Sequence, residues 1–317
     1  MKEVWAMSST DYVKKAVQEV ERELSYSESY LPKQIETPLS SNYLPELDFS
    51  RELDANETNY YQGLIGVLRW IVELGRIDII VPFSLLSRYL VSPREGHLQQ
   101  GFHIFAYLKQ FNRARIVFDD GILDFGDTHF RVCDWSTTYP NAAEVMPPNM
   151  PEARGLSVVT SCNVDADHAG CRVTRRSHTG LLIFVNNTPI IWFSKRQNTV
   201  NLSTFGSEFI ALKIAIDQIE AIRYKLRMLR MFGIPLEGCT SIFCDNESVV
   251  KNATRSESTL GKIQLPIAYH RYREAVAAGF VRIGHIEGEI NPNDVLTKIL
   301  PGARLRKLLQ RIFFWKS

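Results

Sequence analysis

Residues 181–194 read LLIFVNNTPIIWFS, which is two apolar runs joined by the polar turn Asn186-Asn187-Thr188-Pro189. Short apolar runs bounded by turn residues are typical of buried strands, and this pair predicts a β-hairpin. Before the hairpin, Leu156 to Asp167 is predicted to be a strand. After it, Phe205 to Met231 is predicted to be a long helix, because apolar residues recur three and four positions apart.

The rest of the C-terminal half continues the mixed pattern. It predicts a buried strand over Ser241–Cys244, helices that include one around His270 to Ala278, a strand over Val281–His285 and a last helix from about Asn293. Strands that alternate with helices in this way predict an α/β domain. We expect a mixed five-stranded sheet with flanking helices.

The N-terminal part has a helical pattern instead. Helices are predicted over Thr10–Leu24, over Tyr60–Leu74 and from Ser92 to about Gln110, the last with Ser92 to Glu95 as a capping box and proline at the first helical position. A short strand is predicted at Val117–Phe118.

A turn-rich stretch with several prolines separates the two patterns. We therefore divide the chain into a helical part over residues 1–120, a linker over 121–154 and an α/β domain over 155–317.

Composition excludes several classes of function. The 317 residues carry a net charge of +2, so binding to nucleic acid would have to come from local patches. The longest apolar stretch, Ile77 to Leu86, is too short to cross a bilayer, so no membrane partner is expected. Five cysteines without a CxxC pair favour an intracellular location, cytoplasmic or nuclear. The spacing of Cys162, His168, Cys171 and His178 is too loose for a zinc finger.

Four carboxylates occupy unusual positions in the α/β domain. Asp165 lies inside the first predicted strand, where aspartate is depleted. Glu208 falls in the first turn of the long helix, Asp245 ends the strand over Ser241–Cys244, and Asp294 begins the last helix. Taken singly, Glu208 and Asp294 could complement helix dipoles, and Asp245 could be a turn residue. Their combination, one acid on each of four elements, suggests that they meet at one edge of the sheet.

Carboxylates that meet in this way repel one another unless cations neutralise them. Oxygen ligands favour Mg²⁺ or Mn²⁺. Two such ions about 3.5–4 Å apart can activate water and stabilise the leaving oxygen of a phosphodiester. Hydrolysis of a phosphodiester is therefore the chemistry that the four acids predict.

Seven segments in order resemble the RNase H domain of Ty1/copia-type retrotransposons. They are DADHAG (165–170), RSHTG (176–180), WFSKRQ (192–197), STFGSEF (203–209), CDNES (244–248), YHRYRE (269–274) and DVLTK (294–298). The N-terminal part resembles the reverse transcriptase thumb and connection of the same elements, through WAM (5–7), TPL (37–39), LIGVLRW (64–70) and AYLK (106–109).

The resemblance implies a fold, a substrate and a set of site residues. It implies a ribonuclease H-like fold, cleavage of the RNA strand of an RNA/DNA hybrid, and other polyprotein pieces as partners. The implied metal ligands are Asp165, Glu208, Asp245 and Asp294, holding two Mg²⁺ ions that Mn²⁺ can replace. The implied substrate contacts are Ser177, Thr179, Lys195, Gln197 and Asn246, although turn capping explains these residues equally well. His285 is a candidate for assisting proton transfer.

The sequence departs from the family pattern in three places. The Tyr-x-Asp-Asp hairpin of the polymerase is not among the 317 residues, and Phe118-Asp119-Asp120 does not replace it, so no polymerase activity is expected from this chain alone. The segment Leu260–Gln264 is less basic than the family pattern. Asn293 stands where the family usually has alanine.

Two rival functions remain at this stage. One is an inactive retroelement fragment that only binds nucleic acid. The other is a DNA nuclease or transposase of the same fold, because a fold does not fix its substrate.

Overall fold

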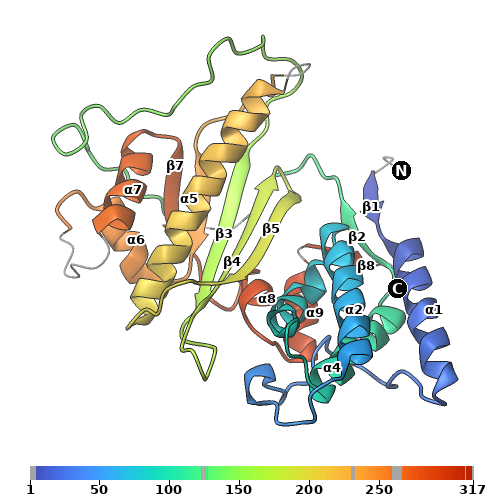
Figure 1. The fold of residues 1–317 in the computed structure, drawn as a ribbon. Coiled ribbons are helices and arrows are strands. Elements are labelled where there is room, and N and C mark those ends of the chain that lie inside the picture. The colour runs from blue at the N-terminus through green and yellow to red at the C-terminus, as the bar shows by residue number, and fades with distance from the viewer. Residues whose placement is uncertain are drawn as a thin grey trace. The chain divides into compact units, whose positions relative to one another are not determined.

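A computed structural model describes residues 5–122, 124, 126, 128–229, 233–258, 266–310 and 312–315. The chain divides into two compact units, which are described separately (Figure 1). The first consists of Met1–Phe118, Cys171–Thr174 and Val295–Ser317, and the second of Asp119–Gly170 and Arg175–Asp294. The ranges 1–120, 121–154 and 155–317 stay a prediction.

The first unit is mostly helical, as its sequence pattern indicates. Helix α1 turns Val13, Val17 and Val20 into the core. Strand β2 pairs antiparallel with β1 and β8 to form a small sheet. The elements are β1 (Ala6–Ser8), α1 (Thr10–Tyr26), α2 (Ala55–Glu73), α3 (Ile80–Leu86), α4 (Glu95–Gln110), β2 (Ala114–Val117), α9 (Gly302–Leu309), β8 (Phe314–Trp315) and the 3-10 helices Pro45–Leu47, Ile77–Ile79 and Ser87–Tyr89.

Two helix starts in this unit differ from the prediction. Helix α2 begins at Ala55, earlier than Tyr60, because Asp54 and Glu57 form a capping box. The capping box predicted at Ser92 is wrong, since α4 begins only at Glu95. Backbone hydrogen bonds from Leu53 N to Pro93 O and from Glu95 N to Arg51 O hold the preceding residues against another segment.

The second unit is built on the predicted mixed five-stranded sheet. Its strand order is β5-β4-β3-β6-β7. Strands β5, β4 and β3 are antiparallel neighbours, whereas β6 and β7 continue parallel to β3. The strands are β3 (Thr160–Asp167), β4 (His178–Val185), β5 (Thr188–Arg196), β6 (Thr240–Cys244) and β7 (Val281–His285). The hairpin prediction is thereby confirmed, and Asn186 takes a left-handed φ of 53° in its turn.

Helix α5 (Thr204–Met228) crosses β3 and β4 and forms the core with them (Figure 1). Phe209, Leu212 and Ile216 of α5 pack in one cluster with Cys162 and Val164 of β3. Helices α6 (Glu247–Thr254) and α7 (Pro266–Ala277) belong to the same unit, and α8 (Asp294–Thr297) begins at its last residue. The predicted end of the long helix, Met231, lies outside the described residues.

The stretch predicted as a linker is bound to the second unit. We call residues 128–158 the strap, which Figure 1 draws as the long green loop outside α6 and α7. Phe130 forms a β-bridge with Gly284 of β7, where an added Cβ would lie 2.9 Å from the Phe130 ring. The Trp135 ring lies under the guanidinium of Arg273, at 4.8 Å. The strap is turn-rich, as predicted, but its side chains complete the packing of this unit.

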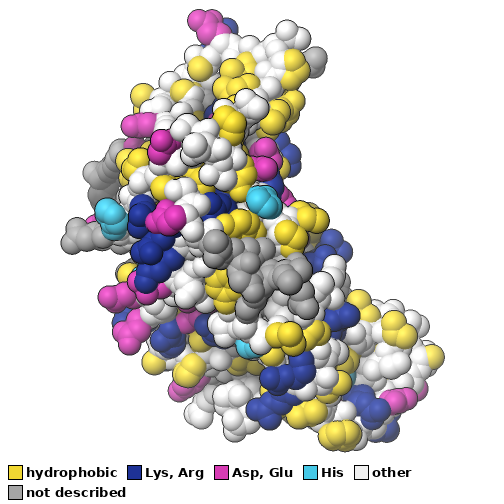
Figure 2. All heavy atoms as spheres, turned by 90° about the vertical axis from the view of Figure 1, so that its left-hand side faces the viewer, with side chains coloured by type: hydrophobic (Ala, Val, Ile, Leu, Met, Phe, Trp, Pro, Cys, Tyr) yellow, Lys and Arg dark blue, Asp and Glu magenta, His cyan; other side chains and the backbone are white. Residues whose placement is uncertain are grey.

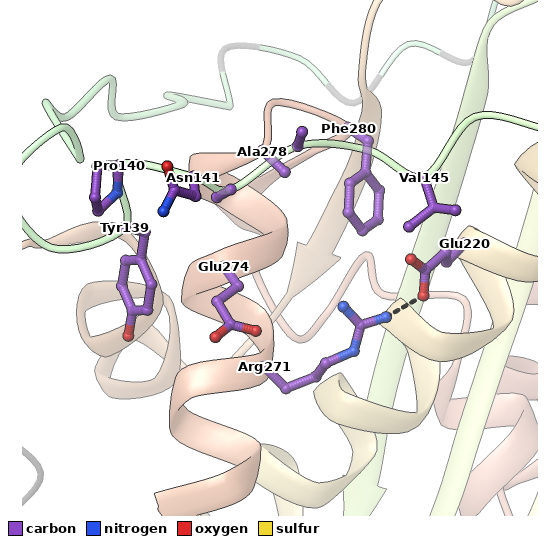
Figure 3. A pocket seen from close by; sticks show the side chains of 11 residues that line it. Tyr139, Pro140, Asn141, Val145, Glu220, Arg271, Glu274, Ala278 and Phe280 are labelled. Atoms are coloured by element: carbon purple, nitrogen blue, oxygen red, sulfur yellow. Dashed lines mark hydrogen bonds and ion pairs between the residues drawn. The ribbon is translucent and has the colours of Figure 1, made fainter.

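An ion cluster fixes the strap to α5. Glu144 accepts hydrogen bonds from Arg223 and Arg227, and the Arg223 side chain is only 3% exposed. Burial alone would raise the pKa of Glu144, but the two arginines outweigh it and lower the pKa below its ordinary value. Beside this cluster the strap covers a cavity of about 370 Å³ against α5 and α7, where Arg271 pairs with Glu220 (Figure 3).

Among the described residues, no helix combines the length and the apolarity needed to cross a membrane. On the face drawn in Figure 2, basic and acidic side chains lie interspersed, in keeping with the small net charge.

Candidate active site

Asp165 lies near the C-terminal end of β3 and is 1% exposed. Its registry partner on β4 is Gly180, and on the other side β3 runs parallel to β6, with Val164 opposite Cys244. Because parallel strands end at the same edge of a sheet, Asp245, which follows β6, comes level with Asp165.

Glu208 reaches this edge as the fifth residue of α5, one position beyond the first turn in which the sequence predicts it. The start of the helix is fixed by Ser203, which accepts a hydrogen bond from Gly206 N, and by Gln197, which donates to Ser207 O at 2.9 Å. The Glu208 side chain is 3% exposed, and its Oε1 accepts the backbone N–H of Ala166 at 3.1 Å. The carboxylate is therefore held beside Asp165.

Three side chains form a compact group of donors at this point. A carboxylate oxygen of Glu208, the Sγ of Cys244 and a carboxylate oxygen of Asp245 all lie within 4.8 Å of one another. Of these three, Asp245 is the partly exposed one, so it gives the group access to solvent.

The charges in this group oppose each other. Burial raises the pKa of Glu208, the negative charges of Asp165 and Asp245 raise it further, and the result is a pKa of about 10. Burial and the neighbouring Glu208 also raise the pKa of the Cys244 thiol. In the absence of a cation, burial and the neighbouring acids therefore favour the protonated form of Glu208.

Asp294 approaches the same strand from the C-terminal side. It is the first residue of α8 and is 4% exposed. The chain before it is tied to β3 and β4, because Asn291 donates to Val164 O and Asn293 donates to the carbonyl oxygens of Asn163 and Gly180. The structure thus brings Asp165, Glu208 and Asp245 together and tethers the backbone at Asp294 to the strand that carries Asp165.

His285 is the last residue of β7, at the same edge of the sheet. It is paired in register with Cys244, and its Nε2 lies 3.2 Å from the backbone oxygen of Asp245. The ring is exposed to solvent. Its assignment to proton transfer stays a prediction, as do the ligand roles of the four acids.

The predicted substrate contacts occupy two kinds of position. Ser177, Thr179 and Gln197 are buried and use their side chains internally: Ser177 accepts from Ala169 N, and Gln197 donates to Thr179 Oγ1. Asn246 caps α6 by accepting from Val249 N. Lys195 is the exposed member and lies opposite Thr179 in the hairpin. Their contact with a substrate stays a prediction, and Leu260–Gln264 lies outside the described residues.

The donor set fits a hard divalent cation. Among the described residues, no hydrogen-bond donor reaches the buried Oε2 of Glu208, although a buried carboxylate oxygen normally requires one. Its neighbours in the donor group are the Cys244 sulfur and a carboxylate oxygen of Asp245, and carboxylate oxygens are the ligands that Mg²⁺ and Mn²⁺ prefer. Asp165, Glu208, Asp245 and Asp294 are the residues that could hold such ions.

The sequence pattern does not assign two contributors to this site. Cys244 falls within a motif, and because it shares one face of an apolar strand with Ile242, that face packs in the core cluster that contains α5. Asn293 stands out in the sequence only as a departure from the family pattern. The sequence gives no local signal for its hydrogen bonds, since its partners lie 130 and 113 residues away.

The homologues of this chain are retrovirus-related Pol polyproteins of copia-type transposons. It is 26% identical over 241 residues to the Pol polyprotein from transposon TNT 1-94 of Nicotiana tabacum, which covers 76% of this chain and 15% of that protein. It is 23% identical over 280 residues to the Pol polyprotein from transposon RE1 of Arabidopsis thaliana, with 88% and 16% covered. The chain thus spans about a sixth of these relatives, and the predicted resemblance is confirmed.

No protein-family model matches the chain. Among solved structures it is similar to LC11-RNase H1 in complex with an RNA/DNA hybrid, at 14% identity and a TM-score of 0.35. That match covers 44% of this chain and 96% of the solved one.

Proposed function

We propose that this chain hydrolyses the RNA strand of RNA/DNA hybrids in a reaction that depends on divalent cations. One observation carries the proposal: the Glu208 carboxyl group is buried beside those of Asp165 and Asp245, and their negative charges raise its pKa. Such an arrangement costs free energy in the metal-free protein, and cations would relieve that cost. The homology to copia-type Pol polyproteins supports the same reaction.

The four carboxylates Asp165, Glu208, Asp245 and Asp294 are proposed to hold two Mg²⁺ ions, which Mn²⁺ can replace. When bound, the ions would activate a water molecule and stabilise the leaving 3′-oxygen. Glu208 must lose its proton before it can serve as a ligand, whereas its hydrogen bond from Ala166 N fixes one of its oxygens beforehand. The protein therefore supplies orientation and negative charge at a position set by β3 and α5.

His285 is proposed to move a proton at the leaving oxygen. Its ring is exposed, and its Nε2 lies near the backbone of Asp245, so it can exchange protons with water at the edge of the acid group. After the P–O bond breaks, the 3′-oxygen needs a proton to leave as a hydroxyl group, and an imidazolium can donate it.

Lys195 is the proposed contact for substrate phosphates among the predicted residues. In register, Ala166, Thr179 and Lys195 lie on three neighbouring strands. An exposed ammonium two strands from the acid-bearing β3 can bind a phosphate of the same duplex. Ser177, Thr179, Gln197 and Asn246 would then act through the internal hydrogen bonds that shape this edge.

We infer that the chain acts as part of a reverse transcriptase polyprotein, with other retroelement pieces as partners and in the cytoplasm or nucleus. No polymerase site of its own is proposed. The competing function is an inactive fragment that binds nucleic acid, and the two differ in one measurable property, which is cleavage.

The test is cleavage of a labelled RNA/DNA hybrid in Mg²⁺, in Mn²⁺ and with a chelator, with single-stranded RNA and duplex DNA as controls. Asp165→Asn and Asp245→Asn should each lower the rate by about a thousandfold, because they remove metal ligands. Binding of the hybrid without cleavage, by a wild-type chain shown to be folded, would establish the competing function. Preference for duplex DNA would indicate a DNA nuclease.

A further inference from the structure

We propose that Asn293 is a positioning residue, which clamps Asp294 against the strand that carries Asp165. The inference rests on the proposed metal-dependent nuclease and adds a residue that the four-carboxylate site does not include. Asn293 precedes Asp294 directly, and its side chain is 0% exposed. An amide that is buried so completely must find hydrogen-bond partners within the protein.

The partners of Asn293 lie on both strands at Asp165. Its Nδ2 donates to the backbone oxygen of Asn163, which is two residues before Asp165 on β3, and to that of Gly180 at 3.1 Å, which is the registry partner of Asp165 on β4. The Asn293 side chain thereby joins the residue before Asp294 to β3, which carries Asp165, and to β4, which is paired with it. We call this arrangement the Asn293 clamp.

The turn that leads to Asp294 is held by further bonds. Asn293 N donates to Asn291 Oδ1 at 3.1 Å, and Asp294 N lies 3.4 Å from the Asn291 backbone oxygen. Asn291 Nδ2 in turn donates to Val164 O at 3.4 Å. The backbone of Asp294 is therefore fixed to the two consecutive carbonyl groups of β3 that precede Asp165, those of Asn163 and Val164.

The clamp matters because acids that share cations repel one another before the cations bind. Two buried carboxylates in separate elements would move apart unless the backbone holds them. A binding site whose ligands are held in place loses less conformational freedom when the ion enters, and so binds it more tightly. An alanine at position 293 could donate neither hydrogen bond.

The test compares Asn293→Ala and the milder Asn293→Ser with wild type. Asn187→Ala is the matched control. It also removes an amide donor, which bonds to Asp119 Oδ2, and it lies in the turn between β4 and β5. Titration calorimetry with Mn²⁺ measures metal affinity without any cleavage. Cleavage assays measure the half-saturating Mg²⁺ concentration and the KM for the hybrid.

Asn293→Ala is expected to weaken Mn²⁺ binding and raise the half-saturating Mg²⁺ concentration by about tenfold, the scale of other residues that orient metal ligands. Asn293→Ser should show a smaller change in the same direction, and Asn187→Ala none. The KM for the hybrid should change by less than about twofold in all variants. A purely structural defect would instead lower the fraction of binding-competent protein and leave its affinity unchanged.

Metal affinity within about twofold of wild type in both Asn293 variants would overturn the clamp while leaving the nuclease intact. If the wild type did not cleave the hybrid, the proposed nuclease function would be overturned. The Mn²⁺ titrations would still test whether Asn293 positions Asp294. A folded wild-type chain that binds no Mn²⁺ would overturn both.

Discussion

Helix α5 meets carboxylates at both of its ends, with opposite consequences. Near its C-terminus, Arg223 and Arg227 pair with Glu144 of the strap, and the pKa of Glu144 is lowered. At its N-terminus, Glu208 is buried next to Asp165 and Asp245, and its pKa is raised to about 10. The ionised form of a glutamate is therefore favoured at the C-terminal end of α5 and disfavoured at the N-terminal end.

The difference separates a structural from a functional use of buried charge. At the arginine end the opposite charges satisfy each other, so the cluster joins the strap to the helix. At the acid end like charges have been brought together in a buried position, which lowers stability unless a ligand binds. Acids whose pKa is raised by burial and by neighbouring like charges are candidates for active-site residues.

The largest effect on stability is expected near the C-terminus of α5, where Arg223 and Arg227 pair with Glu144. Glu144→Ala should lower the free energy of unfolding by about 3 kcal/mol, because it leaves the buried Arg223 without its carboxylate. Urea denaturation would measure it. Glu152→Ala, at an exposed position of the same strap, is the control and should stay within about 0.5 kcal/mol of wild type. An equal effect of both would mean that the ion cluster does not fix the strap.

Removing the charge of Glu208, near the N-terminus of α5, should instead raise the free energy of unfolding. Glu208→Gln should raise the free energy of unfolding of the chelator-treated protein by about 2 kcal/mol at pH 7, because the amide needs no proton uptake on folding. The same variant should lose hybrid cleavage. Added Mg²⁺ should stabilise wild type and leave Glu208→Gln nearly unchanged in thermal unfolding. A destabilised Glu208→Gln would contradict the repulsion at this end.

The two ends should also respond oppositely to pH. The folded-state pKa of Glu208 is raised from 4.5 to about 10, so its contribution is fully present below pH 4.5 and is lost as the pH rises towards 10. The lowered pKa of Glu144 makes its contribution present above its ordinary value and lost as the pH falls. Each group can change the free energy of unfolding by about 1.4 kcal/mol per pH unit at most. In chelator, Glu208→Gln should flatten the alkaline limb of the stability curve, and Glu144→Gln the acid limb.

The smallest effect is expected at Cys244. Its thiol lies within the acid group, yet Mg²⁺ prefers oxygen ligands, so Cys244→Ala should change Mg²⁺-dependent cleavage by less than about twofold. Thiolates bind Zn²⁺ well, so inhibition of the wild type by Zn²⁺ should weaken in this variant. Titrating Zn²⁺ against cleavage in both proteins measures the difference. A large loss in Mg²⁺ would show that the thiol has a part in the reaction.

Local patterns in the sequence predicted the secondary structure of the second unit well. The hairpin follows from two apolar runs around Asn186 and Asn187, and β7 has the predicted bounds, Val281–His285. The helix starts of the first unit are harder to predict from sequence. Helix α4 begins later than predicted, because Pro93 is bound to Leu53, which is 40 positions away. The four acids could be named from sequence because local patterns reveal their positions: one lies inside a strand, one follows a strand and two lie near helix starts.

By itself, the sequence determined which residues are apolar, where turns break the chain, and that four separate elements of the α/β domain each carry or adjoin one acid. Only the tertiary structure decided that residues 128–158 pack on the second unit as the strap, because Glu144 and Arg223 are 79 residues apart. It likewise decided the hydrogen bonds of Asn293 and the raised pKa of Glu208. Hydrogen bonds between distant residues and the loss of solvent around a charge exist only after the chain has folded, and no local pattern of residues encodes them.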